Sequence, residues 1–233
     1  MDLKELGRVN PEDHWYYQSK SRYLIELNRK YLENAEKIIE IGAGSTFFLN
    51  EALKVSTNAL GYAVDINYSG QEQTENKRII LSRTLPEVSG DFYLFIDVLE
   101  HVENDIELLK ESIQFAKPNS YILISVPAFS FLWSGHDDFL EHKRRYTTRQ
   151  LKKLSEKADL EIIDLRYVFG LLLPLACLVR PVKKLLNIKG DDLTSLHPSL
   201  NKLSTWVFKH FDFINRNQLF GLSATVLLKT PTF

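Results

Sequence analysis

Asp97-Val98-Leu99-Glu100-His101-Val102 is the most informative stretch of this chain. Its position downstream of a second element, Glu40-Ile41-Gly42-Ala43-Gly44, indicates the fold. Both elements follow an apolar segment typical of a buried strand. Glu40–Gly44 lies at the end of Lys37–Ile41, and Asp97–Val102 lies at the end of Phe92–Val98. Asp65 lies near the end of a third such segment between them, Ala59–Ile66. This arrangement predicts a nucleotide-binding α/β domain with its pocket at the carboxyl ends of the strands.

Strand-like and helix-like segments alternate along most of the chain. Besides the three segments above, strands are expected at Arg78–Leu81, Tyr121–Val126, Glu161–Val168 and Leu222–Lys229, and helices at His14–Leu32, Ser45–Leu53, Asn104–Ala116 and Thr147–Ala158. Repeated β-α alternation implies a parallel sheet that helices cover on both faces. The expected fold class is therefore α/β, with a doubly wound, mostly parallel sheet of seven strands.

The whole chain, residues 1–233, is expected to form a single domain. Residues 1–36 form an N-terminal helical segment ahead of the first strand. The segment between the last two strands is far longer than a hairpin loop and carries helical signals of its own. We interpret residues 170–220 as a helical cap insertion between the last two strands.

The composition limits the class of protein. Hydrophobic residues make up 44% and charged residues 25%, which is ordinary for a soluble globular protein. A net charge of −1 argues against a dedicated nucleic-acid binder. The single cysteine, Cys177, excludes an internal disulfide and fits a reducing compartment. The N-terminus lacks the apolar core of a signal peptide and no run reaches about 18 apolar residues, so we expect a cytoplasmic protein.

The element Glu40–Gly44 indicates which cofactor the pocket takes. Glycine lacks the Cβ that would keep backbone N–H groups from a ligand, and the helix that follows directs its positive end at a carboxylate or phosphate. Asp65 is placed to accept both hydroxyls of a ribose. A dinucleotide fingerprint would need glycine at position 47, where Phe47 stands. Glu40 is placed to hold an ammonium group, which S-adenosylmethionine carries and NAD lacks, so the residues favour S-adenosylmethionine.

These motifs resemble those of class I S-adenosylmethionine-dependent methyltransferases, of the type 11 and type 12 groups, over about residues 35–165. The resemblance implies a Rossmann-like fold. In that family the glycine loop holds the methionine part, the acid after the second strand binds the ribose, and the end of the fourth strand borders the methyl acceptor. The cofactor-binding residues that this implies are Glu40, Gly42, Ala43, Gly44, Asp65, Ile66, Asp97 and Val98.

Two further stretches resemble a bacterial branch of this family whose members often accompany enzymes of cell-surface glycan synthesis. They are His14-Trp15-Tyr16-Tyr17 and His142-Lys143-Arg144-Arg145-Tyr146. The expected function is methyl transfer to a small-molecule, sugar or lipid-linked acceptor, at a hydroxyl. Thr46 replaces the third glycine of the family loop, and no acid follows the third strand near Ser82. These departures support the alternative, a non-catalytic methyltransferase-like binding or scaffold protein.

A hydroxyl acceptor calls for a base, and histidine is the usual one near neutral pH. His142 is the leading candidate, followed by His136 and His101. The loop after the fifth expected strand also supplies predicted substrate-binding residues, with the arginines suited to a phosphate or carboxylate: Arg144, Arg145, Tyr146 and Trp133. Each of these side chains also has a structural interpretation, in which it braces its own loop or lies at a solvated helix start.

Metal binding is a further interpretation of this loop, through His136, Asp137, Asp138 and His142. Their spacing fits no strong metal signature, so we predict no metal.

The apolar stretch at residues 168–186 leaves two interpretations open. Its leucines are interrupted by Pro174 and followed by Arg180, Lys183 and Lys184, the pattern of an interfacial membrane segment. The same residues fit the buried side of a cap over a pocket. With a lipid-linked acceptor the two interpretations merge, because the insertion would cover an apolar entrance at the inner membrane surface.

Overall fold

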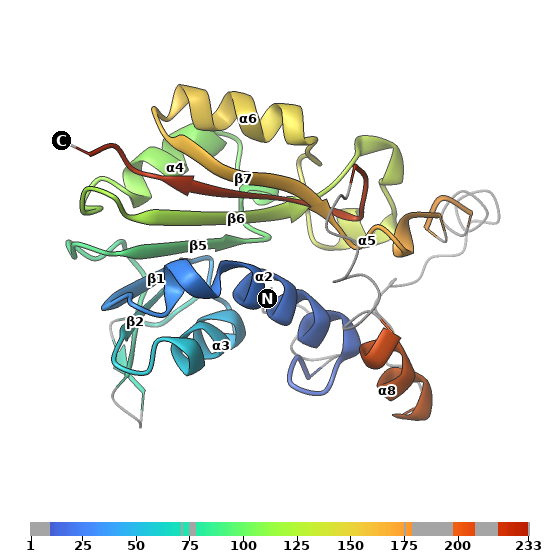
Figure 1. Ribbon diagram of the computed structural model, residues 1–233, viewed down its shortest axis with the longest axis horizontal. Helices are drawn as coiled ribbons and strands as arrows, with labels where there is room; N and C mark the ends of the chain where they lie inside the picture. Colours follow the sequence, from blue (N-terminus) through green and yellow to red (C-terminus); the bar gives the residue numbers. More distant parts are fainter. Residues whose placement is uncertain are drawn as a thin grey trace.

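The computed structural model describes residues 10–70, 72–74, 78–174, 176–178, 198–207 and 219–232. Its strands are β1 (Lys37–Ile41), β2 (Leu60–Val64), β3 (Glu72–Gln73), β4 (Ile79–Ser82), β5 (Phe92–Ile96), β6 (Tyr121–Pro127), β7 (Glu161–Val168) and β8 (Ser223–Lys229). Within the described residues they form one sheet in the order β3-β4-β2-β1-β5-β6-β8-β7, with helices on both faces (Figure 1).

The centre of the sheet is parallel, as the β-α alternation predicts. β1 pairs in parallel with β2 on one side and with β5 on the other, and β4 and β6 extend the parallel part. The chain moves outward from β1 through β2 to β4 and then returns to β5 on the opposite side of β1. Open α/β sheets bind ligands at such a reversal, outside the carboxyl ends of the strands, here those of β1 and β5. We call this edge of the sheet the crevice.

The sheet of the described chain has eight strands rather than the expected seven. The additional strand is β3, which pairs antiparallel with β4 at the sheet edge. Glu72 and Gln73 are both exposed and form only a two-residue strand. So short a polar segment has no hydrophobic periodicity, and its pairing depends on the neighbouring strand. The doubly wound, mostly parallel architecture is otherwise as expected.

Helices α2 (Trp15–Leu32) and α3 (Phe47–Val55) cover one face of the sheet, while α4 (Asp105–Ser112) and α6 (Thr148–Lys157) cover the other (Figure 1). Successive residues of β1 supply the two cores: Ile38 packs with the α2 and α3 side, and Ile39 with the opposite side. Side chains alternate in this way because neighbouring Cβ atoms of a strand point to opposite faces.

The structure describes only part of the predicted insertion at residues 170–220. Helix α8 (Pro198–Val207) lies against the start of α2, where the Asn201 side chain accepts a hydrogen bond from the Trp15 amide at 2.9 Å. The Asn201 amide also donates to the Asp13 carbonyl at 2.6 Å. Residues 175, 179–197 and 208–218 lie outside the described chain, and with them part of the stretch 168–186. None of the described helices is both long and apolar enough to cross a membrane.

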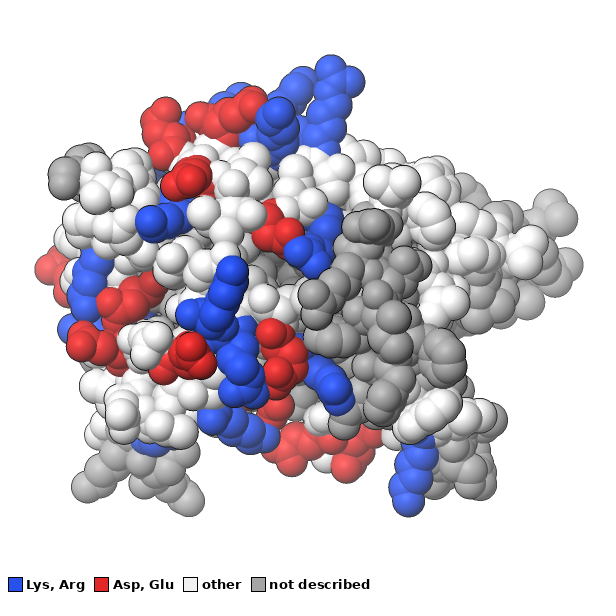
Figure 2. All heavy atoms as spheres, in the orientation of Figure 1, with Lys and Arg blue, Asp and Glu red and all other residues white. Residues whose placement is uncertain are grey.

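Charged side chains of both signs are interspersed over the face drawn in Figure 2. This mixture agrees with the net charge of −1.

Candidate functional site

The crevice is built from the segments that follow β1, β2 and β5, three adjacent strands. The glycine loop follows β1, Asp65 follows β2, and Asp97 follows β5. Because the strands are parallel, all three segments leave the sheet at the same edge. The structure therefore brings together the residues that the sequence predicted for cofactor binding.

The glycine loop lies directly against Val98. Gly42 has a φ of +66°, and a Cβ built there would lie 2.5 Å from Cγ2 of Val98, closer than any side chain tolerates. Gly44 also has a positive φ of +48°. Ala43 is fully buried, and its amide donates to the Val64 carbonyl at 3.0 Å. The loop conformation thus requires glycine, and it couples the end of β1 to the end of β5.

Asp65 is tied to the glycine loop. Its Oδ2 accepts a hydrogen bond from the Gly44 amide at 2.9 Å, and its Oδ1 accepts from the Asn67 amide at 2.9 Å. Tyr68, which the sequence did not single out, donates its hydroxyl to the Gly44 carbonyl at 2.7 Å. Ile66 is 76% exposed, so it offers an apolar surface at this end of the crevice.

Glu40 is buried and supports the helix that follows the loop. Its Oε2 accepts a hydrogen bond from the Leu49 amide at 3.1 Å, in the first turn of α3. Thr46, at the N-cap of α3, makes no side-chain cap of its own, so Glu40 takes that role. Burial raises the pKa of the Glu40 carboxyl from 4.5 to about 7.

Asp97 pairs with a lysine that the sequence analysis missed. Lys20, on α2, is fully buried and hydrogen-bonds both carboxylate oxygens of Asp97, with Oδ1 at 2.6 Å. Burial alone would lower the pKa of the Lys20 ammonium, but the Asp97 charge outweighs it and the pKa lies above its usual value. This ion pair fixes the N-terminal helix to the edge of the crevice.

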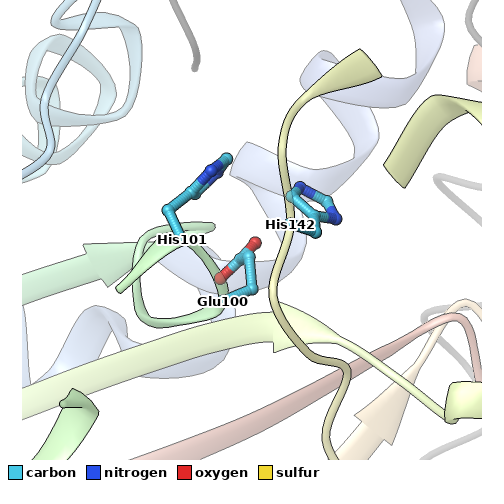
Figure 3. A group of neighbouring side chains, drawn as sticks. All are labelled: Glu100, His101 and His142. Carbon is cyan, nitrogen blue, oxygen red and sulfur yellow. The ribbon is translucent and has the colours of Figure 1, made fainter. Parts of the chain in front are cut away.

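Next to Asp97, three side chains converge: Glu100, His101 and His142 (Figure 3). The first two belong to the 3-10 helix η1 (Leu99–His101), and His142 comes from the loop after α5 (Gly135–Phe139). The two imidazole rings meet edge to face, with centroids 4.7 Å apart. Burial and the nearby Asp97 raise the pKa of the Glu100 carboxyl well above its usual value.

The orientation of His142 is set by a buried ion pair. Nδ1 of His142 lies 2.8 Å from Oδ1 of Asp137, which is fully buried. Arg145 donates to both oxygens of Asp137, at 2.7 and 2.9 Å. Although burial opposes ionisation, the hydrogen bonds from His142 and Arg145 hold the pKa of Asp137 well below its usual range. His142 is thus held with Nε2 free to face the cluster.

The predicted substrate-binding residues make contacts within the protein. Arg145 is only 4% exposed and also donates to the Ala128 carbonyl at 3.0 Å. Its contact with a substrate anion stays a prediction. Arg144 donates to the carbonyls of Val102 and Glu103, at 2.9 and 2.7 Å. The Arg144 contacts arise because the loop folds back over the end of η1, where unpaired carbonyls need donors.

Three more predicted residues lie around this loop. Tyr146 is buried, and its hydroxyl contacts the Leu99 carbonyl at 3.1 Å and Asp105 at 2.9 Å. Trp133 is half-buried and donates from Nε1 to Asp138 at 2.8 Å. His136 lies in α5 and is not part of the cluster of Glu100, His101 and His142.

The residues that the sequence analysis missed share one property. Lys20, Tyr68, Asp137 and Glu100 act through partners that are distant in sequence or carry no motif of their own. Glu100 was quoted only as part of the run from Asp97 to Val102, and Asp137 was considered only as a candidate metal ligand. Lys20 stands in the polar run Gln18-Ser19-Lys20-Ser21-Arg22, so the sequence did not distinguish it from a solvated lysine.

Comparisons with known proteins agree with this geometry. Residues 14–165 match the profile of a family described as a methyltransferase domain. No curated protein matches the sequence at a significant level.

Solved structures share the fold at low sequence identity. A SAM-dependent methyltransferase from Archaeoglobus fulgidus is 15% identical, covering 91% of this chain and 94% of its own, with a TM-score of 0.55. The 1,6-didemethyltoxoflavin-N1-methyltransferase from Burkholderia thailandensis is also 15% identical, covering 94% of this chain and 81% of its own, with a TM-score of 0.57. Since the family match spans well over half of the sequence, the chain belongs to the methyltransferase family and is a class I S-adenosylmethionine-dependent methyltransferase.

Proposed function

We propose that this protein methylates a hydroxyl group of a small molecule, with a sugar or a lipid-linked sugar as the preferred acceptor class, and that His142 accepts the proton. The observation that carries the proposal is the environment of His142. Its Nδ1 is held by Asp137 at 2.8 Å, while its buried Nε2 has no hydrogen-bond partner in the described part of the chain. An imidazole held in this way is prepared to take a proton at Nε2.

The crevice residues fit S-adenosylmethionine, because the glycine loop leaves no space for a Cβ and Asp65 lies beside it. The cofactor supplies a methyl group that its sulfonium already activates. Gly42, Ala43 and Gly44 hold the methionine part, and Glu40 attracts its ammonium. Asp65 and Ile66 border the adenosine, and Asp97 and Val98 separate the cofactor from the acceptor.

The chemistry then needs little beyond positioning and proton removal. The hydroxyl oxygen of the acceptor forms a bond to the methyl carbon as the carbon–sulfur bond breaks. The hydroxyl proton passes to Nε2 of His142, and Asp137 stabilises the imidazolium that results. The products are a methyl ether, S-adenosylhomocysteine and a proton that His142 releases to water.

The lipid-linked form of the acceptor is supported by exposed apolar side chains around the insertion. Leu178, Leu203 and Trp206 are 70%, 56% and 53% exposed. Exposed apolar groups of this size suit contact with a lipid chain or a membrane surface. We propose that the segment 168–186 contributes to this contact at the inner membrane surface.

The test compares variants of two of the three candidate bases, His142 and His136, on a panel of acceptors. We expect radiolabelled methyl transfer to sugars and lipid-linked sugars, and an at least 100-fold lower kcat in His142→Gln, since general base catalysis contributes about that much. The dissociation constant of S-adenosylhomocysteine, measured by calorimetry, should not change. His136→Gln is the matched variant and should retain near wild-type kcat. The reverse pattern would assign the base to His136, and transfer to amines alone would exclude a hydroxyl acceptor.

A further inference from the structure

The cluster of Glu100, His101 and His142 has the composition and geometry of a cation site. One ligand atom from each residue lies within 4.8 Å of the other two. The Glu100 carboxylate extends toward the space between the two imidazole rings (Figure 3). Ligand atoms around one tetrahedral ion, with bonds of about 2.0–2.2 Å, lie about 3.3–3.6 Å apart. Small side-chain rotations would therefore close the cluster on an ion.

The buried Glu100 carboxylate lacks a partner that a cation would supply. It is fully buried, and within the described residues neither of its side-chain oxygens has a hydrogen-bond partner on another residue. An ionised carboxylate is seldom buried without a counter-charge, because the loss of hydration is costly. Lys20 is committed to Asp97, and Arg145 to Asp137. A bound cation would supply the missing partner.

His142 is prepared for ligation in the manner of metal-binding histidines. Its Nδ1 pairs with Asp137 at 2.8 Å, so Nε2, which has no hydrogen-bond partner among the described residues, is the nitrogen available to an ion. A carboxylate behind a ligating histidine fixes the ring and makes it a better ligand. Asp137 is itself held by Arg145 and by the Ser134 amide at 2.8 Å. Asp137 and Arg145 therefore support His142 in the way that outer residues support a metal-ligating histidine.

We propose that Glu100, His101 and His142 bind one divalent first-row transition-metal ion, such as Zn²⁺ or Mn²⁺. Two imidazole nitrogens and one carboxylate favour such ions, whereas Mg²⁺ and Ca²⁺ prefer oxygen ligands throughout. Three protein ligands leave a coordination position open. No metal was predicted from the sequence, because η1 is distant in sequence from the run His136–His142 and only the fold brings His142 beside Glu100 and His101.

The consequence for catalysis rests on the proposed function, whereas ion binding does not. With an ion bound, Nε2 of His142 would be one of its ligands, and a position would remain for the acceptor hydroxyl. The ion would lower the pKa of that hydroxyl, whose proton would leave to water. In the metal-free protein His142 accepts the proton itself.

The test uses the untagged full chain, freed of metal by dialysis against a chelator. Zn²⁺ and Mn²⁺ are titrated by calorimetry, Co²⁺ serves as a visible-absorption probe of its ligands, and Mg²⁺ is the comparison. We expect one transition-metal ion per chain, with Mg²⁺ binding at least 10-fold more weakly. Glu100→Gln and His101→Gln should abolish the site, and Asp137→Asn should weaken it about 10- to 100-fold.

Glu103→Gln is the matched control, because Glu103 is exposed in the same region and should leave ion binding unchanged. Retained S-adenosylhomocysteine binding in each variant shows that it is folded. No stoichiometric binding by the wild type, or binding unaffected by Glu100→Gln and His101→Gln, would overturn the proposal. Binding without methyl transfer to any hydroxyl would leave the metal site in place and reject the proposed function instead.

Discussion

Lys20 and Asp97 form an ion pair that joins the N-terminal helix to the carboxyl end of β5. The lysine side chain is fully buried and the aspartate side chain is 29% exposed. Asp97 has a φ of +53°, an uncommon conformation for a residue other than glycine. The pair therefore holds a strained residue of the crevice from a segment 77 residues away.

Replacing Lys20 tests how much this ion pair contributes. We expect Lys20→Met to lower the free energy of unfolding by about 2–3 kcal/mol, because it leaves Asp97 without its buried counter-charge. Urea denaturation measures the loss. The double variant Lys20→Met/Asp97→Asn should recover part of it, because the stranded charge is removed. A single variant as stable as the wild type would show that the pair is energetically neutral.

Gly42→Ala tests the contact between the glycine loop and β5. The added Cβ would meet Val98 at 2.5 Å and strain a φ of +66°, so we expect S-adenosylhomocysteine to bind at least 10-fold more weakly. Calorimetry measures the change. Gly70→Ala, where a Cβ meets nothing within 4 Å, is the control. The double variant Gly42→Ala/Val98→Ala should regain part of the affinity, and unchanged affinity in Gly42→Ala would contradict the predicted role of the loop.

The buried Glu40 makes stability depend on pH. Its folded-state pKa of about 7 lies above the unfolded value near 4.5, so its stabilising contribution is complete below pH 4.5 and is lost as pH rises through 7. Glu40→Gln lacks this loss. Relative to the wild type, the variant should gain on the order of 3 kcal/mol between pH 4.5 and pH 8 in urea denaturation.

Glu87→Gln, an exposed position, is the control and should show no such gain. Saturating S-adenosylhomocysteine should reduce the gain in Glu40→Gln, if the ligand ammonium lies beside the carboxylate. An equal difference at both pH values would show that Glu40 titrates normally.

Replacing Arg145 distinguishes two roles for this residue, positioning of Asp137 and His142 or binding of the substrate. If it positions Asp137 and His142, Arg145→Met should lower kcat at least 10-fold, leave the acceptor KM within about 2-fold, and cost about 3 kcal/mol of stability. Initial-rate kinetics and urea denaturation measure these quantities. A raised KM with unchanged kcat would instead show that Arg145 grips the substrate, as the sequence suggested. Arg145→Lys should recover little, because lysine lacks the two-pronged geometry.

Much of the architecture was predictable because its signals are local. The bounds of β1 and β7 agree with the expected segments, and α2, α6 and β8 agree within one residue at each end. Apolar runs, glycine turns and capping residues act over a few positions, so they can be read without knowing the fold. The two-residue β3 was not predicted, because its pairing with β4 has no local sequence signal.

The candidate site shows the same division between local signals and long-range contacts. The sequence by itself determined the crevice, since Gly42, Asp65 and Asp97 follow strands and parallel strands end at one edge. Only the tertiary structure decided the partners of the side chains around it. Lys20 reaches Asp97 from another helix, and the loop that holds His142 folds back onto η1 beside Glu100. Such contacts depend on how distant segments pack, and burial then fixes which charges must pair, because an isolated charge cannot remain in the interior.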